Sequence, residues 1–159
     1  MKNKMKRAIW IALAVLFCMA CTIASAAADW PADAAIYVLE DLAKTYNQPA
    51  PKLTKTDKGY ICADWLGCSL FLLKLPGAES EIVAAYITAK TANPADFMVA
   101  VYLTVASVTA SSKYNPFLDY MMLLDGEPVV AWRIGESWLY RMSYDESGAL
   151  SFVVIRGDI

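Results

Sequence analysis

Two predicted helices begin with the same three residues, and extended segments follow each of them. Proline, alanine and aspartate occur at positions 31–33 and again at 94–96. Proline suits the first helical position, where its missing N–H is not needed, and aspartate in the first turn is attracted by the helix dipole. The first signal predicts an amphipathic helix over residues 31–46, which ends before the prolines at 49 and 51.

The second signal precedes an uncharged apolar run, FMVAVYLTVASVTA, at residues 97–110. Its start signal and its length predict a buried helix, while its valine and threonine content leaves a buried pair of strands as the alternative. Asn115 and Pro116 then predict a shorter helix over residues 117–124, which ends at an Asp-Gly pair.

Six segments rich in β-branched and aromatic residues predict strands. They cover residues 60–64, 68–75, 81–90, 128–134, 137–144 and 150–156. The third of these also fits two helical turns. In the fifth, Trp138, Tyr140 and Met142 alternate with less apolar residues, as expected for a sheet that packs against helices on one face.

The predicted fold is therefore α+β. We expect an antiparallel sheet of about six strands, arranged as two three-stranded meanders and covered on one face by two or three helices. Residues 29–159 form one domain, long enough to bury a core. A helix and three strands over residues 29–91 are followed by a helix, a short helix and three strands over 92–159, which suggests a tandem α-βββ duplication.

Residues 1–28 have the layout of a cleaved signal peptide. A basic start, an apolar run at 8–20 and a series of small residues follow one another, with cleavage predicted after Ala26 or Ala28. The apolar run is shorter than the ~20 residues that span a bilayer. The protein is therefore predicted to be exported, to a bacterial periplasm or outside the cell.

Lipoprotein processing is the alternative. The motif CMAC would make Cys21 the acylated residue, although Cys18 stands where such motifs usually carry leucine. In that case a lipid anchor would hold the protein at a membrane.

The charge of the exported part disfavours some partners. The first 28 residues carry four of the 14 basic residues and none of the 16 acidic ones, so the remainder has a net charge of −6. Nucleic acids and anionic membranes both attract concentrated Lys and Arg. Neither is a predicted partner.

Two cysteines, Cys62 and Cys68, remain in the exported part, and an oxidising compartment predicts a disulfide between them. Thiol-exchange motifs have two intervening residues rather than five, and zinc sites usually use histidine, which this chain lacks. The predicted disulfide would close a loop that carries Trp65 and Leu66. These two side chains either fold back into the core or form a rigid contact loop.

Histidine-dependent catalysis is excluded, since the chain contains no histidine. No glycine-rich phosphate loop is present, and we predict no cofactor and no metal. Asp64, Asp119, Asp125 and Glu127 leave a carboxylate-based hydrolase as a minor alternative.

The final meander suggests a basic and aromatic surface made of Trp132, Arg133, Tyr140 and Arg141. The alternative is that the arginines only point into solvent. We predict a non-catalytic binding domain, inhibitor-like or envelope-associated, for a protein or an envelope component. A carrier with an apolar pocket between sheet and helices, behind Tyr60, Trp132 and Tyr140, is the second hypothesis.

Overall fold

The structure of the protein, a computed structural model, describes residues 31–74, 81–126, 129–134 and 138–157; of residues 129–134 it describes the backbone alone. The predicted signal peptide, its cleavage sites and Cys21 lie outside the described residues.

Three helices occur within the described residues. They are α2 (Ala32–Thr45), α3 (Pro94–Thr109) and α4 (Pro116–Leu124). Asn93 caps α3 by accepting hydrogen bonds from the backbone N–H groups of Ala95 and Asp96, and Asn115 caps α4 in the same way through Phe117. Segment 97–110 is thus helical rather than a pair of strands. No described helix is both long and apolar enough to span a membrane.

The strands form a single antiparallel sheet in the order β1-β2-β3-β4-β7-β6-β5. Their bounds are β1 Thr54–Thr56, β2 Gly59–Trp65, β3 Cys68–Lys74, β4 Ile82–Ala89, β5 Val129–Ile134, β6 Trp138–Tyr144 and β7 Leu150–Arg156. The predicted α+β class is confirmed, and the strand beyond the six predicted ones is the short β1.

The two meanders meet at β4 and β7, where Tyr86 lies opposite Val153. An ion pair of 2.8 Å between Arg156 and Glu81 joins the end of β7 to the residue before β4. Both meanders therefore share one sheet, with the last strand of each at the centre. The proposed duplication is compatible with this arrangement and stays a hypothesis.

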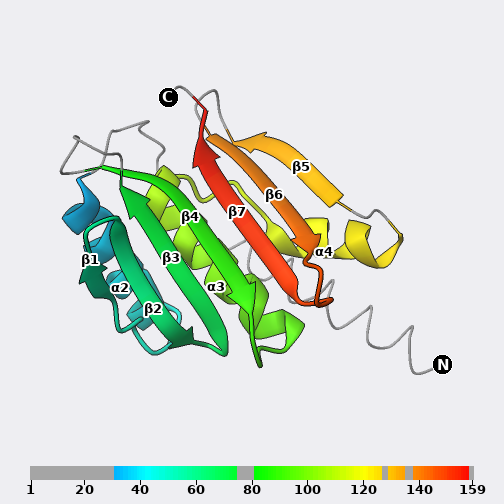
Figure 1. Ribbon diagram of the computed structural model, residues 1–159, viewed down its shortest axis with the longest axis horizontal. Coiled ribbons are helices and arrows are strands. Elements are labelled where there is room, and N and C mark those ends of the chain that lie inside the picture. The colour runs from blue at the N-terminus through cyan, green and yellow to red at the C-terminus, as the bar shows by residue number, and fades with distance from the viewer. Residues whose placement is uncertain (1–30, 75–80, 127–128, 135–137, 158–159) are drawn as a thin grey trace.

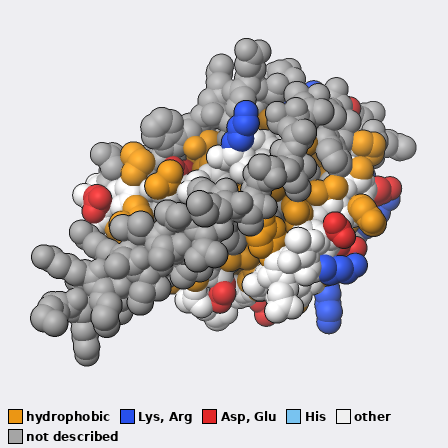
Figure 2. Space-filling view, turned by 180° about the vertical axis from the view of Figure 1, so that it is seen from behind, with side chains coloured by type: hydrophobic (Ala, Val, Ile, Leu, Met, Phe, Trp, Pro, Cys, Tyr) orange, Lys and Arg blue, Asp and Glu red, His pale blue; other side chains and the backbone are white. Residues whose placement is uncertain are grey.

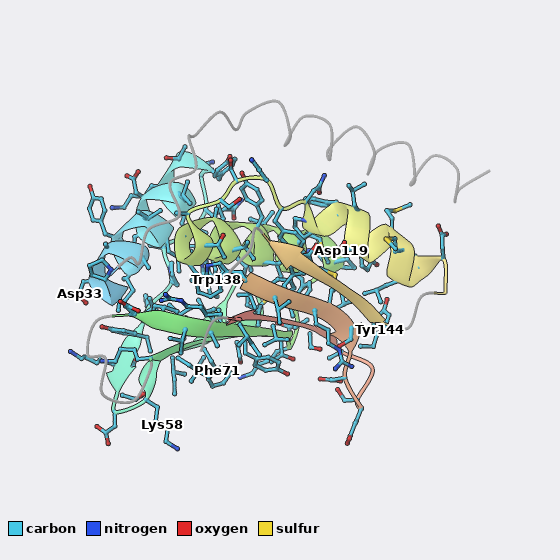
Figure 3. The ribbon with its side chains drawn as sticks, turned by 90° about the horizontal axis from the view of Figure 1, so that it is seen from above. Asp33, Lys58, Phe71, Asp119, Trp138 and Tyr144 are labelled. Carbon is cyan, nitrogen blue, oxygen red and sulfur yellow. The ribbon has the colours of Figure 1, made fainter. Side chains whose placement is uncertain are left out.

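All three helices lie on the same side of the sheet (Figure 1). The side chains that face them are largely buried and include Leu70, Leu72, Ile87 and Phe152, which pack against Leu39 of α2 and the fully buried side of α3. Viewed along the sheet, the helices lie on one side and Phe71 points to the other (Figure 3). The core is thus a single layer between helices and sheet, and none of the described helices covers the opposite face of the sheet.

Candidate functional site

The predicted disulfide is not formed. Cys62 and Cys68 are both buried free thiols. Cys62 pairs with Leu70 across the hairpin, and Cys68 pairs with Trp65, so the two cysteines are not cross-strand partners. Their Sγ–H groups instead approach backbone carbonyl oxygens, of Asp64 at 3.5 Å and of Leu66 at 3.7 Å.

The turn between the two strands explains this difference. The strands continue to Trp65 and restart at Cys68, so the turn contains Leu66 and Gly67 rather than all five residues between the two cysteines. Both turn residues have positive φ, 55° and 73°, as in the two-residue hairpin turns that match the sheet twist. Pairing of the strands up to the turn places the cysteines in offset positions.

The environment of Cys68 also disfavours thiol chemistry. Burial, followed by the nearby carboxylates of Asp96 and Asp64, raises the pKa of its thiol to about 12. Because the thiolate is the reactive form of cysteine, Cys68 is inert at neutral pH.

Trp65 belongs to the core, so the contact-loop hypothesis is wrong for this residue. Its side chain is 3% exposed, and its indole N–H donates a hydrogen bond of 2.6 Å to the carbonyl oxygen of Pro49. Leu66 is half-buried and packs against the same core. The carbonyl group that accepts this hydrogen bond lies in the segment before β1. The spacing of residues within the hairpin could not predict this contact.

The predicted basic and aromatic surface is divided between the two sides of the sheet. Tyr140 faces the helices, and its ring centroid lies 4.3 Å from that of Tyr114 and 5.9 Å from that of Phe152. Trp132 and Arg133 lie on β5, whose side chains are outside the described part of the chain. Arg141 is exposed on the opposite side from Tyr140.

Asp119 and Tyr114 form a polar pair beside these rings. The Tyr114 hydroxyl donates a hydrogen bond of 2.7 Å to Oδ2 of Asp119, whose side chain is only 5% exposed. Burial raises the pKa of Asp119 to about 6, although the hydrogen bond from Tyr114 opposes the shift. Burial and the neighbouring carboxyl raise the pKa of Tyr114 as well.

Of the other predicted acids, two are exposed and one lies outside the described residues. Asp64 and Asp125 are exposed, at the β2–β3 hairpin and after α4 respectively, while Glu127 lies outside the described residues. Among the described residues, no cluster of three or more Asp, Glu, His or Cys side chains could hold a metal ion.

The side of the sheet away from the helices, which we term the open face, carries an extensive apolar surface. The strand register aligns two rows of outward-facing residues across β2, β3, β4, β7 and β6. One row is Ile61, Phe71, Tyr86, Val153 and Arg141, and the other is Leu73, Ala84, Ile155 and Leu139.

The exposure of these residues is unusual for a sheet packed on one side only. Ile61, Leu73, Leu139 and Ile155 are 36%, 42%, 45% and 47% exposed. An antiparallel sheet with one solvated face normally alternates apolar and polar residues, whereas a sheet buried on both faces has nearly continuous apolar strands. The central strands of this sheet have the nearly continuous apolar residues of a sheet buried on both faces. Their outward-facing side chains are nevertheless exposed to solvent.

The sequence of two central strands carries a signal for this face. Strands β3 and β7 read CSLFLLK and LSFVVIR, with four consecutive apolar residues in each. Such runs mark strands with apolar side chains on both faces. On the helix side, Figure 2 shows apolar side chains at the surface as well. The exposed large apolar residues of the helices include Tyr37 of α2 and Leu118 and Leu124 of α4.

The fold and this surface define an α+β protein with a helix-covered antiparallel sheet and one open apolar face. Comparison of the chain with protein-family models, with curated proteins and with solved structures finds no match.

Proposed function

We propose that the protein is an exported, non-catalytic binding domain that receives a partner protein on the open face of its sheet. The observation that carries this proposal is the set of aligned apolar side chains on that face, four of which are more than a third exposed. Contiguous apolar patches of this kind on soluble proteins usually mark interaction sites.

The size of the open face suits a protein partner. Five strands spaced ~4.8 Å apart, each about seven residues long with ~3.4 Å per residue, give a projected area of roughly 550 Å². A standard protein interface buries about 800 Å² per partner, measured over the uneven surface. The two areas are of the same order.

The carrier hypothesis has less support. A carrier needs a cavity between sheet and helices, but the space behind Tyr140 is filled by the rings of Tyr114 and Phe152. The predicted export signal favours a partner among proteins of the cell envelope or outside the cell.

The test compares captures by three forms of the protein from a native envelope extract. The open-face variant combines Leu73→Thr, Leu139→Thr and Ile155→Thr, because threonine keeps the strand propensity while removing apolar area. The control variant combines Leu118→Gln and Leu124→Gln on α4, which replaces similarly exposed residues on the helix side. Circular dichroism checks that all three forms are folded.

We expect one or more proteins to be captured by the wild type and by the control variant and to be lost from the open-face variant. Equal capture by all three forms, or capture by none of them, would contradict the proposed site.

A further inference from the structure

An acidic residue, Asp64, lies near one edge of the open face. It belongs to β2, whose register against β3 shifts between Cys62 and Trp65. A bulge of this kind adds one residue to a strand, and here it leaves both Ala63 and Asp64 exposed between two buried residues. Lys90, close by, donates a hydrogen bond to the carbonyl oxygen of Ala63 and forms no ion pair with Asp64. Asp64 therefore adds to the open face a carboxylate with which no described residue pairs.

Arginine lies near the other edge of the open face. Arg141 is exposed on β6, and the register of β5 places Arg133 opposite the outward-facing Leu139. In the strand order, four steps separate β2 from β6, or ~19 Å at ~4.8 Å per step. Asp64 and Arg141 of one chain are therefore too far apart to pair with each other, and Arg141 forms no ion pair with any other described residue.

A two-fold axis along β4 brings these opposite charges together between two copies of the chain. Because β4 is the middle strand of the seven-stranded sheet, packing two open faces about this axis places β2 of each copy over β6 of the other, and β3 over β7. Sheets packed in this way lie ~10 Å apart, with strand directions within about 30° of each other. Ile61 and Arg141 share one row, so Arg141 of one copy lies over Ile61 of the other, and Asp64 follows one row further along β2, ~7 Å away. The long arginine side chain spans this offset, and the symmetry forms the same pair twice.

The apolar residues of the open face also meet under this axis. Phe71 of β3 lies over Val153 of β7 in the other copy, and Tyr86 of β4 lies beside the axis, next to its own counterpart. Each copy contributes a projected area of roughly 550 Å², so the pair buries roughly 1,100 Å² before the unevenness of the surface is counted. Stable protein interfaces bury about 1,200–2,000 Å² in total. The open face is thus large enough for a reversible dimer.

Two other arrangements fit the charges less well. A two-fold axis across the strands would place β2 over β2 and β6 over β6, so that like charges would face each other. An anionic membrane attracts clusters of Lys and Arg, whereas this face combines arginine with an exposed acid. The distribution of charge therefore favours association of two copies about the axis along β4.

We propose that the partner received by the open face is a second copy of this chain, and that the two copies pack sheet to sheet with Asp64 of each paired to Arg141 of the other. This inference rests on the proposed function and identifies its partner. The second copy carries the same predicted export signal, so it reaches the same compartment. The apolar rows supply the free energy of association, and the two charge pairs fix the orientation.

The test measures self-association of the purified exported protein by sedimentation velocity at micromolar concentrations. The wild type is compared with the triple-threonine open-face variant and with the α4 control variant. Asp64→Arg, Arg141→Asp and the double variant with both changes reverse the charges one at a time and then together. Both residues are exposed, so these substitutions leave the fold intact, and thermal melts verify this.

We expect the wild type and the control variant to form dimers and the open-face variant to stay monomeric. Each single charge reversal places two like-charge pairs in the dimer and should raise its dissociation constant at least about tenfold. The double reversal exchanges the two charges and should restore the dissociation constant to within about threefold of the wild-type value.

Three results would overturn this inference. If the wild type stays monomeric, the second copy is not the partner; capture of a different protein through the open face would then leave the proposed function standing, and no capture would remove both. Dimers that persist in the open-face variant would exclude the sheet-to-sheet interface. A double reversal that dimerises as weakly as the single ones would exclude the pairing of Asp64 with Arg141, and with it the axis along β4.

Discussion

Phe71 and Tyr86 lie opposite each other on the central strands β3 and β4, with ring centroids 6.1 Å apart, on the face of the sheet that no described helix covers. Two aromatic rings at this distance attract each other and bury part of their area even without a partner. They form the centre of a surface that resembles the inner side of a sheet in its composition, although it is exposed to solvent.

Neighbouring residues of β3 should differ sharply in their contribution to stability. Leu72 faces the helices and is 1% exposed, whereas Leu73 faces outward and is 42% exposed. We expect Leu72→Ala to lower the free energy of unfolding by about 2–5 kcal/mol, because it leaves a cavity in the core. Leu73→Thr should change it by less than about 1 kcal/mol. Urea unfolding curves of both variants measure the difference, and similar losses for both would contradict the assigned faces.

Gly67 should be intolerant of substitution for two separable reasons. Its φ of +73° is unfavourable for other residues, and a Cβ atom there would lie 2.6 Å from the backbone nitrogen of Ala92, which itself donates a hydrogen bond to the Gly67 carbonyl oxygen. Gly148 has a similar φ of +80°, but a Cβ atom there would meet nothing within 4 Å.

We expect Gly148→Ala to cost about 1–2 kcal/mol of stability through φ alone. Gly67→Ala should cost roughly 1–3 kcal/mol more, because its Cβ also displaces the backbone before α3. Equal losses in thermal or urea unfolding would show that the hairpin does not contact Ala92 as described.

The stability of the protein should fall as the pH rises through the titration range of Asp119. The pKa of this carboxyl is raised from 3.8 to about 6 in the folded state, so below pH 3.8 both the folded and the unfolded chain are protonated there and its stabilising effect is fully present. Above the folded pKa the ionised carboxylate is buried, and the loss amounts to about 3 kcal/mol, since one pKa unit corresponds to about 1.4 kcal/mol.

The isosteric variant Asp119→Asn should lack this pH-dependent change in the free energy of unfolding, because its amide does not ionise. It keeps an oxygen acceptor for the Tyr114 hydroxyl. Urea unfolding at pH 4 and pH 7 should therefore show a larger decrease in the wild type than in the variant. An identical pH dependence in the two proteins would exclude Asp119 as its source.

Both cysteines should resist alkylation in the native protein and react after unfolding without any reductant. They are buried, and the pKa of Cys68 is raised to about 12 by burial and by nearby carboxylates. Mass spectrometry after iodoacetamide treatment, with and without urea, measures the number of modified thiols. Absence of labelling in urea unless a reductant is added would mean that a disulfide had formed after all.

Signals within a few residues of each other predicted the elements well. The Pro-Ala-Asp and Asn-Pro starts, the turn residues and the β-branched segments predicted α2, α3, α4 and β2 to β7 with boundaries close to those observed. Such signals act through local effects: the proline ring restricts φ, a cap satisfies free N–H groups, and branched side chains favour extended backbone.

The two cysteines show where local reasoning failed. Their number and spacing indicated a disulfide, but the partner of each cysteine depends on where the hairpin turns. The turn position was decided by contacts with distant backbone, since three N–H groups, of Lys90, Thr91 and Ala92, donate to the single carbonyl oxygen of Gly67.

The sequence alone determined the α+β class, the helix ends and most of the strands, because these depend on interactions between near neighbours. Only the tertiary structure decided that β4 pairs with β7, that Trp65 reaches the carbonyl oxygen of Pro49, and that Phe71 and Arg141 share the uncovered face. Each of these outcomes depends on which segments, far apart along the chain, pack together, and the free energy of that packing belongs to the whole fold rather than to any one stretch of it.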